Sequence, residues 1–534
     1  MRLTNLKVTN HKRLADLDIE IREHLVLVGA NDVGKSSLLR CLDLVLGAST
    51  AQLYSQISAE DFRDTTQPFI IEVQLQGFSA DDKALYPDEI NVDPATKISS
   101  MTVQLSATID ESETIGIERR ALGSGTTRQL SRDQVAGFGW KFLSATTQSR
   151  DLRDDRKSPL DEILRTVELG DEKDAFESIA TSLTTQLGES KVLGGLRENL
   201  AGQLSKALPE PVKKEDLSFV PGADADNDVL SDVRLRVSKS GVPHDLSAQS
   251  DGTRALFAMA FYDLTSVGAN VVGIDEPEVH LHPTSQRSVA RLLKSNPNQK
   301  VIATHSSDIV SAFEADSIVV VRQGGQVVQP TAGFLSADEK LVVRWWVRDR
   351  LEPLTSRRVI AVEGPSDRIV LERAADLTDR NLDRLGISIV EAGSKTSMPA
   401  VEKLFGATGF GVPVSQLVDE DAEASTAKRL GITATDLPNH SIWVSRTDLE
   451  DEYVRAIGAS SVWTALRAST MFSSNQLNNC VPTGAGDTYT DGDVSGFCRK
   501  YKVEAAIVVA GILTTETAKK ISSIESLLTE AAQV

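Results

Sequence analysis

A glycine-rich segment near the start of the chain has the composition of a loop that binds phosphate groups. Residues 29–36 read Gly-Ala-Asn-Asp-Val-Gly-Lys-Ser. In such a loop the glycines let backbone N–H groups surround phosphate oxygens, the lysine reaches the β- and γ-phosphates, and the hydroxyl holds Mg²⁺. The residues expected to contact a nucleotide here are Gly29, Asn31, Gly34, Lys35, Ser36 and Ser37.

The acidic partner of this loop lies about 240 residues further along the chain. An apolar stretch ends in Asp275 and Glu276, of which Asp275 can share the Mg²⁺ with Ser36 and Glu276 can orient the attacking water. A second apolar stretch, residues 301–304, leads to His305, whose imidazole can sense the γ-phosphate. Since a compact nucleotidase brings these parts much closer together, we expect a large insertion between them.

A segment rich in small and hydroxyl side chains precedes the acidic strand. Residues 246–254 read Leu-Ser-Ala-Gln-Ser-Asp-Gly-Thr-Arg and lead into a helical pattern. Such residues at a helix N-terminus can offer N–H donors to a γ-phosphate. Ser247, Ser250 and Gly252 are therefore further candidates for nucleotide binding.

Carboxylates follow apolar stretches again in the last third of the chain. Glu363 comes directly after residues 358–362, and Asp367 opens the helical pattern that follows. Asp419 and Asp421 form an Asp-X-Asp pair after another apolar stretch, which would place both on one face of a strand. Two hard cations that clamp a scissile phosphate need such carboxylates. Each acidic loop taken alone is more simply read as a solvated turn, so the prediction depends on their occurring together.

The pattern around these residues predicts an α/β chain of several domains. The apolar run 25–28 suits a buried strand and a helical pattern begins at Ser37, so the phosphate lies at a helix N-terminus. Between residues 159 and 208, leucines and isoleucines recur at three- and four-residue steps, which predicts inserted amphipathic helices. We favour a dimer contact for this insertion over packing on its own domain. The expected domains are 1–150 (ATPase, first part), 151–215 (helical insertion), 216–345 (ATPase, second part) and 346–534 (carboxylate domain with a C-terminal helical segment).

The composition and net charge of the chain argue against some classes of function. The 534 residues carry a net charge of −19, with a pI near 5.0, which argues against a protein that coats nucleic acid nonspecifically. Basic pairs such as Arg119-Arg120 are expected to be solvated surface pairs. Three scattered cysteines and the lack of a long apolar run favour a cytoplasmic protein with reduced thiols and no membrane partner.

The order of the first motifs resembles the ABC-type ATPases of the SMC, Rad50 and RecF group over residues 1–330. Phosphate loop, serine-containing signature, Asp-Glu-Pro strand and Thr-His-Ser switch follow one another as in that group. The resemblance implies ATP as the nucleotide and a composite site in a homodimer. The signature from Ser247 to Gly252 of one subunit would cap the nucleotide bound by Lys35 of the other. This signature departs from Leu-Ser-Gly-Gly-Gln, so either Ser247 or Ser250 could contact the phosphate.

The carboxylate motifs resemble the Toprim domain, and an ABC-type ATPase followed by Toprim is similar to the OLD family of ATP-dependent nucleases. The resemblance implies Mg²⁺ or Mn²⁺ as cofactor. It also implies Glu363 as a metal ligand and acid/base. The remaining ligands that it implies are Asp367, Asp419, Asp421 and, from the acidic run 448–452, Glu450. Lys502 matches a catalytic lysine near the scissile phosphate, with Lys500 as its competitor.

We therefore expect an ATP-dependent and metal-dependent DNA endonuclease that acts as a homodimer or larger homo-oligomer. Its expected role is antiphage defence or DNA processing, with a helicase-like or other defence protein as a further partner. Two alternatives stay open. The chain could be an ATP-switched DNA clamp that does not cleave, or a Toprim nucleotidyl transferase.

Overall fold

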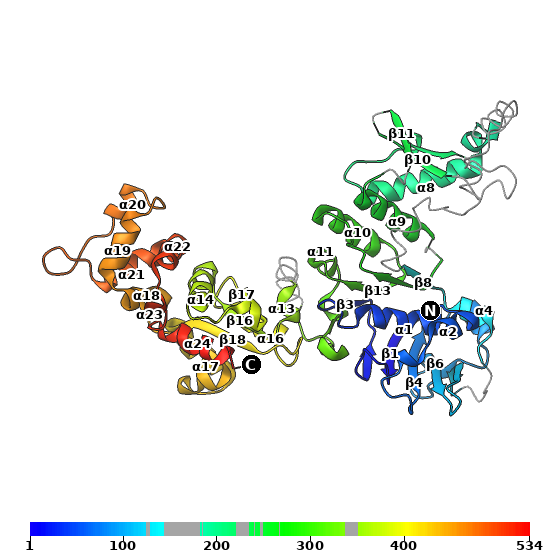
Figure 1. Cartoon of the computed structure of the whole chain (residues 1–534), viewed down its shortest axis with the longest axis horizontal. Helices are drawn as coiled ribbons and strands as arrows, with labels where there is room; N and C mark the ends of the chain where they lie inside the picture. Colours follow the sequence, from blue (N-terminus) through cyan, green and yellow to red (C-terminus); the bar gives the residue numbers. More distant parts are fainter. Residues whose placement is uncertain are drawn as a thin grey trace. The chain divides into compact units, whose positions relative to one another are not determined.

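The computed structural model describes residues 1–123, 129–143, 182–183, 185–220, 234–239, 241–245, 249–265, 268–336 and 351–533. The chain divides into two compact units that meet in sequence between Val327 and Val328 (Figure 1). The domain boundary predicted between residues 345 and 346 lies outside the described ranges, as do Ser247 and residues 151–181 of the predicted insertion. Within the described ranges, no helix is long and apolar enough to cross a membrane.

A mainly parallel sheet carries the phosphate loop in the first unit. In spatial order its strands are β15 (Val327–Val328), β14 (Ile318–Val321), β3 (Leu25–Val28), β13 (Gln299–Thr304), β12 (Val271–Asp275) and β8 (Trp140–Leu143). Strands β3, β12 and β13 are buried along their whole length, as expected for central parallel strands covered on both faces. Associated helices are α1 (Lys35–Leu46), α9 (Asp251–Thr265), α10 (Pro283–Ser295), α11 (Ser307–Val310), η5 (Ala315–Ser317) and η6 (Gln323–Gly325).

An antiparallel sheet packs on the other side of α1. Its strands are β2 (Leu17–Glu20), β1 (Arg2–Thr9), β4 (Phe69–Gln76), β6 (Ser99–Ile109), β5 (Asn91–Val92) and β7 (Ile115–Leu122). Helix α1 shares one core with this sheet and with β3 and β13. Arg119 on β7 is buried and donates to the carbonyl of Ala48 at 2.7 Å, just beyond the end of α1. The prediction that Arg119 is a solvated surface residue is therefore wrong. Shorter elements here are α2 (Thr50–Gln56), η1 (Ala59–Asp61), α3 (Ala80–Leu85) and α4 (Arg132–Gly137).

The described part of the insertion contributes one long helix and leads into a small separate sheet. These elements are α8 (Lys191–Ala207), η3 (Lys214–Asp216), β9 (Leu217–Val220), β10 (Arg234–Lys239) and β11 (Val242–Asp245). Leu200 and Leu204 of α8 are buried in one cluster with Phe257 of α9. On the same helix, Val192 and Leu196 are exposed. Helix α8 thus packs within its unit through one part of its apolar stripe, while the predicted dimer contact stays a prediction.

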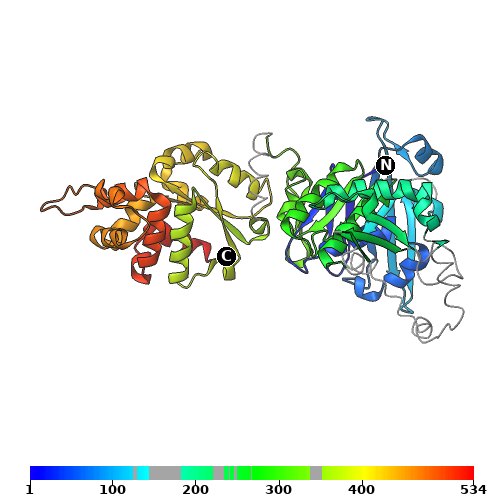
Figure 2. The same ribbon diagram turned by 90° about the horizontal axis from the view of Figure 1, so that it is seen from above.

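A four-stranded parallel sheet forms the centre of the second unit. In spatial order its strands are β17 (Ile387–Glu391), β16 (Arg358–Val362), β18 (Val414–Asp419) and β19 (Ile442–Ser445). Ile360 and Val362 face the larger core, while Val359 and Ala361 point to the opposite face because side chains alternate along a strand. The helices of this unit (Figures 1 and 2) are α13 (Glu352–Thr355), α14 (Pro365–Leu377), α15 (Leu382–Leu385), α16 (Met398–Phe405), α17 (Glu420–Leu430), η7 (Ala434–His440), α18 (Leu449–Ile457), α19 (Ala459–Ala468), α20 (Ser474–Asn478), α21 (Asp491–Lys500), α22 (Lys502–Ile512), α23 (Thr515–Ala518) and α24 (Ser522–Ala531).

The last helix, α24, ties the strands of this sheet together. Glu530 accepts hydrogen bonds from Ser415 on β18 and from Ser441 just before β19, both at 2.9 Å, and pairs with Arg358 on β16 at 2.5 Å. The C-terminal helix therefore fixes the positions of three strands, and the opposite ends of two of them, β16 and β18, carry predicted carboxylates.

Candidate functional site

The phosphate loop connects β3 to α1, and two of its glycines are required by its geometry. Gly34 has a φ of +114°, and a Cβ there would lie 2.6 Å from Cδ2 of Leu14. A Cβ on Gly29 would lie 2.3 Å from the carbonyl oxygen of Val321 on β14. The loop leads directly into the N-terminus of α1, where a helix has N–H groups available to bind an anion. Asn31 lies exposed in the same loop.

Lys35 is buried inside this loop. Its Nζ donates to the carbonyls of Gly29 at 3.0 Å and Ala30 at 2.8 Å, and lies 2.7 Å from Nε2 of His305. Burial lowers the pKa of Lys35, while the carboxylate of Glu276 acts in the opposite direction. The structure thus brings the predicted phosphate lysine and the predicted switch histidine into direct contact.

The acidic strand reaches the loop as the sequence predicted. Strand β12 ends at Asp275, whose Oδ1 accepts a hydrogen bond of 3.1 Å from Oγ of Ser36. Burial raises the pKa of Asp275 because it disfavours the ionised form. A nearby cation would therefore stabilise this carboxylate. Asp275 and Ser36 together can hold Mg²⁺ beside the β- and γ-phosphates.

Glu276 stands next to His305 in a strained backbone position. Its φ is +48°, and its N–H donates to the carbonyl of Ala303 on β13 at 2.8 Å. Oε1 of Glu276 lies 3.6 Å from Nε2 of His305. Burial and then the Lys35 ammonium lower the pKa of His305, so its ring is neutral near pH 7. This pair is placed to orient a water molecule at the γ-phosphate.

Glu278 is a residue of this site that sequence reasoning missed. Its Oε2 accepts a hydrogen bond of 2.8 Å from Oγ1 of Thr304, and its Oε1 accepts the backbone N–H of His305. Burial raises the pKa of this carboxyl group. The available signal was a second acid two positions after Glu276, but its partner could only be identified once β12 and β13 were known to be neighbours.

A cavity of about 640 Å³ opens beside Ser36 and Ser37. Its other lining residues are His11, Lys12, Arg13, Arg40, Ser58, Glu60 and Asp61. Burial lowers the pKa of His11 to about 4, so the positive charge of this wall comes from Lys12, Arg13 and Arg40. Glu60 and Asp61 lie in the same wall, and Asp61 pairs with Arg40 at 2.6 Å, so the cavity carries charges of both signs beside the phosphate loop.

The described part of the signature segment, residues 249–254, leads into α9 and forms its first turn. Ser250 accepts a hydrogen bond of 3.3 Å from the N–H of Thr253, and a Cβ on Gly252 would lie 2.7 Å from the carbonyl oxygen of His280. Ser250 and Gly252 line a cavity of about 920 Å³ together with His282, which caps α10. The described signature residues therefore pack against the segment that follows the acidic strand.

In the second unit, the predicted carboxylates meet at the carboxyl ends of the parallel strands. Glu363 follows β16, and its carbonyl accepts the N–H of Gly393 at 2.9 Å, beyond the end of β17. Asp367 lies in the first turn of α14 and accepts the N–H of Gly364 at 3.0 Å. Asp419 ends β18. Three separate elements thus bring carboxylates to one edge of the sheet.

Lys502 and Glu450 complete this edge from more distant helices. Nζ of Lys502 lies 4.0 Å from Oδ2 of Asp419 and 3.7 Å from Oε1 of Glu450. Glu450 is almost fully buried, and its Oε2 has no hydrogen-bond partner within the described chain. Lys500 instead lies over the ring of Tyr501, 5.6 Å from its centroid. Of the two competing lysines, Lys502 is the one that contacts the carboxylates.

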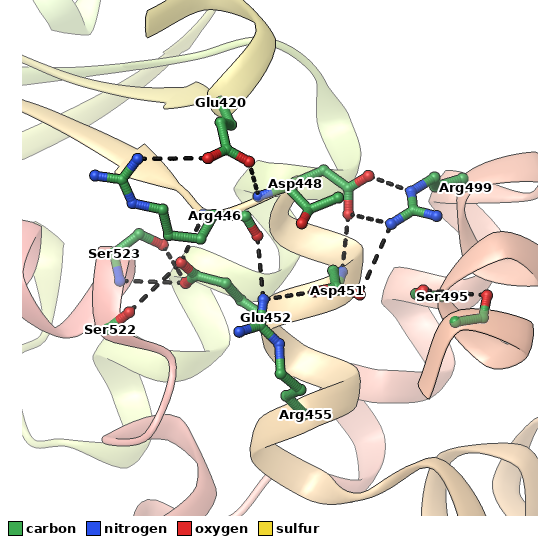
Figure 3. Close-up of polar contacts among 12 residues, drawn as sticks. Glu420, Arg446, Asp448, Asp451, Glu452, Arg455, Ser495, Arg499, Ser522 and Ser523 are labelled. Carbon is green, nitrogen blue, oxygen red and sulfur yellow. Dashed lines mark hydrogen bonds and ion pairs between the residues drawn. The ribbon is translucent and has the colours of Figure 1, made fainter. Parts of the chain in front are cut away.

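The remaining acids of the run 448–452 have other partners (Figure 3). Asp448 caps α18 by accepting the N–H of Asp451 at 2.8 Å and pairs with Arg499. Glu452 accepts hydrogen bonds from both the N–H and the hydroxyl of Ser523, at 3.2 and 2.7 Å. These contacts fix α18 so that Glu450 points to the site.

Burial and mutual repulsion shift the pKa values of the clustered carboxyl groups. Burial and then the neighbouring Asp367 raise the pKa of Asp419 to about 7. Burial also raises the pKa values of Asp367 and Glu450. Burial acts to lower the pKa of Lys502, but the carboxylates of Glu450 and Asp419 raise it overall. The raised pKa values mean that the ionised forms of these carboxyl groups are unfavourable without a further positive charge, so a cation bound at this edge would stabilise them.

Asp421 does not lie where the sequence placed it. The chain leaves the strand at Asp419 and α17 begins at Glu420, so Asp419 and Asp421 do not share a strand face. Asp421 is exposed and accepts a hydrogen bond of 2.6 Å from Nζ of Lys395. Lys395 follows β17, and the sequence analysis had given it no role.

The donor set fits hard divalent cations. Within the described ranges, no three His, Cys, Asp or Glu side chains already converge as a metal-holding group. The unpartnered Oε2 of Glu450 and the raised pKa values of its neighbours are nevertheless what an oxygen-ligated cation would relieve. Glu363, Asp367, Asp419, Asp421 and Glu450 are the residues that could hold it.

Each of the two units matches a known protein family. Residues 25–311, more than half of the chain, match the family described as "AAA domain, putative AbiEii toxin, Type IV TA system". Residues 354–421 match the "Overcoming lysogenization defect protein-like, TOPRIM domain". The predicted fold class, an α/β ATPase followed by a Toprim domain, is thus confirmed. These two domains imply the use of a nucleotide and of a divalent metal ion.

Three curated proteins are similar to the chain over most of its length. The Old nuclease of Escherichia phage P2 is 22% identical over 77% of this chain and 76% of its own. The endonuclease GajA of Bacillus cereus (strain VD045) is 20% identical over 74% and 71%. The OLD nuclease of Thermus scotoductus (strain ATCC 700910 / SA-01) is 26% identical over 78% and 82%.

Proposed function

Because the chain belongs to the family of the matching AAA domain and carries an OLD-like Toprim domain behind it, we propose that it is an ATP-dependent DNA endonuclease. The proposal includes a divalent metal cofactor, Mg²⁺ or Mn²⁺. Relatives named as nucleases cover both units, which supports hydrolysis of nucleic acid by the second unit.

One observation carries the proposal. Lys502 lies between Asp419 and Glu450, at 4.0 and 3.7 Å, on the edge where Glu363 and Asp367 also meet. A cluster of carboxylates with one lysine at the ends of parallel strands can bind metal ions and a phosphodiester together. Neither a structural ion pair nor a nucleotide site alone requires this many acids at one edge.

The proposed reaction is in-line attack of water on a phosphodiester. When bound, Mg²⁺ or Mn²⁺ would lower the pKa of the attacking water and stabilise the negative charge on the leaving 3′-oxygen. Asp367, Asp419, Asp421 and Glu450 would hold the cations, while Glu363 would hold metal and accept the proton of the attacking water. Lys502 contacts the scissile phosphate. The bond between phosphorus and the 3′-oxygen breaks, and its products are a 5′-phosphate and a 3′-hydroxyl.

The first unit is proposed to bind and hydrolyse ATP in a homodimer or larger homo-oligomer. Lys35 holds the β- and γ-phosphates, Ser36 and Asp275 hold Mg²⁺, and Glu276 with His305 orients the water. Ser247, Ser250 and Gly252 of a second copy would close the site over the γ-phosphate. The proposed setting is the cytoplasm, in defence against foreign DNA or in DNA processing, with a helicase-like or other defence protein as a further partner.

Plasmid cleavage tests the proposal. Supercoiled plasmid should be nicked or linearised with Mg²⁺ or Mn²⁺ and stay intact in EDTA, and parallel reactions with and without ATP show how the nucleotide acts. Intact plasmid under every condition, together with ATP-dependent DNA binding, would favour a non-cleaving clamp. Incorporation of labelled nucleotides would favour a nucleotidyl transferase instead.

A further inference from the structure

Lys395 and Asp421 form an ion pair beside the Toprim carboxylates. Lys395 lies on the loop after β17 and Asp421 in the first turn of α17, and their side chains meet at 2.6 Å. Both are half-exposed or more, at 49% and 63%. The hydrogen bond to Asp421 raises the pKa of Lys395, and Glu363 and Asp419 act in the same direction. The ammonium is therefore within electrostatic reach of three of the proposed metal ligands.

Lys395 and Lys502 approach the same carboxylates from different elements. Lys502 begins α22 and contacts Asp419 and Glu450, while Lys395 contacts Asp421. On the other side of α17, Arg446 pairs with Glu423 at 3.1 Å and Glu420 at 3.6 Å. Those two acids are not proposed ligands. Lys395 is thus distinguished from Arg446 by pairing with a proposed ligand.

We propose that Lys395 is a second phosphate-contacting lysine of the nuclease site, and that its ammonium holds Asp421 until a divalent cation binds there. An ammonium and a metal ion compete for the same oxygens of Asp421, so metal binding releases Lys395. The freed side chain is long and solvated, so its ammonium can then contact a phosphate of DNA bound at the same edge. This inference rests on the proposed nuclease function.

The metal half of the inference is tested without DNA. Lys395→Met keeps most of the side-chain length and removes the charge, so Mn²⁺ measured by titration calorimetry on the full chain should bind about threefold more tightly. Lys395→Arg should bind Mn²⁺ as the wild type does. Two controls remove a charge elsewhere: Arg446→Ala beside α17, and Lys520→Met, whose lysine pairs with Glu516 at 2.9 Å with similar exposure. Unchanged or weaker Mn²⁺ binding in Lys395→Met, or equal tightening in Arg446→Ala, would overturn the competition.

The phosphate half is tested by cleavage at saturating Mn²⁺. Lys395→Met should nick plasmid at least ~10-fold more slowly in spite of tighter metal binding, and the slope of its DNA affinity against salt should fall by about one. Lys395→Arg should recover much of the rate, and phosphate release from ATP should stay at the wild-type level. Wild-type nicking by Lys395→Met would overturn the phosphate contact. If the wild type itself does not nick, the nuclease proposal fails together with this half, while calorimetry still decides the competition for Asp421.

Discussion

Glu278 holds the backbone of His305 from a neighbouring strand end. One carboxylate oxygen accepts the N–H of His305, and the other accepts the hydroxyl of Thr304 at 2.8 Å. His305 in turn lies 2.7 Å from the ammonium of Lys35 and 3.6 Å from Glu276. Two acids after β12 thus hold the histidine after β13: Glu276 contacts its side chain, and Glu278 anchors its backbone.

Replacing Glu278 should impair ATP hydrolysis more than ATP binding. Glu278→Ala leaves two buried donors without their acceptor, at about 1–3 kcal/mol each, and frees His305 to move. We expect kcat for phosphate release to fall about tenfold or more with little change in KM, since Lys35 and Ser36 still hold the phosphates. Glu278→Gln keeps one carbonyl acceptor and should recover part of the rate. Equal rates in Glu278→Ala and the wild type would exclude a positioning role.

Substitutions of Lys35 and Glu276 should affect ATP binding and ATP hydrolysis differently. Lys35→Ala removes the charge that holds the β- and γ-phosphates, so both nucleotide binding and hydrolysis should be lost. Glu276→Gln should still bind a fluorescent ATP analogue with nearly wild-type affinity while hydrolysing ATP at least ~100-fold more slowly. Hydrolysis at the wild-type rate by Glu276→Gln would show that another group orients the water.

A composite ATPase site predicts complementation between inactive chains. Ser250 lies at the start of α9 and lines a cavity, so Ser250→Arg should block the signature side of the site without altering the phosphate loop. Mixed with Lys35→Ala, it should restore part of the phosphate release, because each mixed dimer then contains one intact site. Mixtures that stay inactive at all ratios, although the chains still associate by light scattering, would argue against the composite site.

The raised pKa of Asp419 predicts that the metal-free protein loses stability as pH rises. With a pKa of about 7 instead of 3.8, folded Asp419 keeps a proton that the unfolded chain has already released. The free energy of unfolding therefore falls between about pH 4 and pH 7. In EDTA at pH 8, Asp419→Asn should melt at least about 2 °C above the wild type, and this difference should vanish near pH 4.

Saturating Mg²⁺ provides the control for that measurement. Bound metal stabilises the wild type but not the variant that lacks a ligand, so the order of the two melting temperatures should reverse. A variant that melts below the wild type in EDTA at pH 8 would show that Asp419 is stabilised as a carboxylate by the protein alone.

The sequence predicted those features that depend on local spacing. The turn at Gly29 and Gly34, the strand ending in Asp275, and the carboxylates after β16 and β18 are each visible within a few residues, because glycine geometry and apolar runs are local properties. The contact of Ser36 with Asp275 could also be anticipated, since the two motifs occur together in nucleotide-binding folds.

The missed features depend on tertiary contacts. The hydrogen bond from His305 to Glu278 exists because β12 and β13 are neighbours, and Arg119 is buried because β7 passes the end of α1. Asp421 was misplaced because the strand ends at Asp419, two residues earlier than the predicted alternation required. Local hydrophobicity determines neither the order of the strands in a sheet nor the exact residue at which a strand ends.

We propose that the metal site of the nuclease is separate from the ATPase site. The most direct test is a double variant, Asp419→Asn with Asp421→Asn, in which plasmid nicking and phosphate release are both measured. Both replacements keep the side-chain shape while removing two charges from the proposed metal site. We predict that nicking falls at least ~100-fold while ATP hydrolysis is maintained, which shows that the variant chain is still folded. Nicking at the wild-type rate would contradict the assignment of the Toprim edge as the nuclease site.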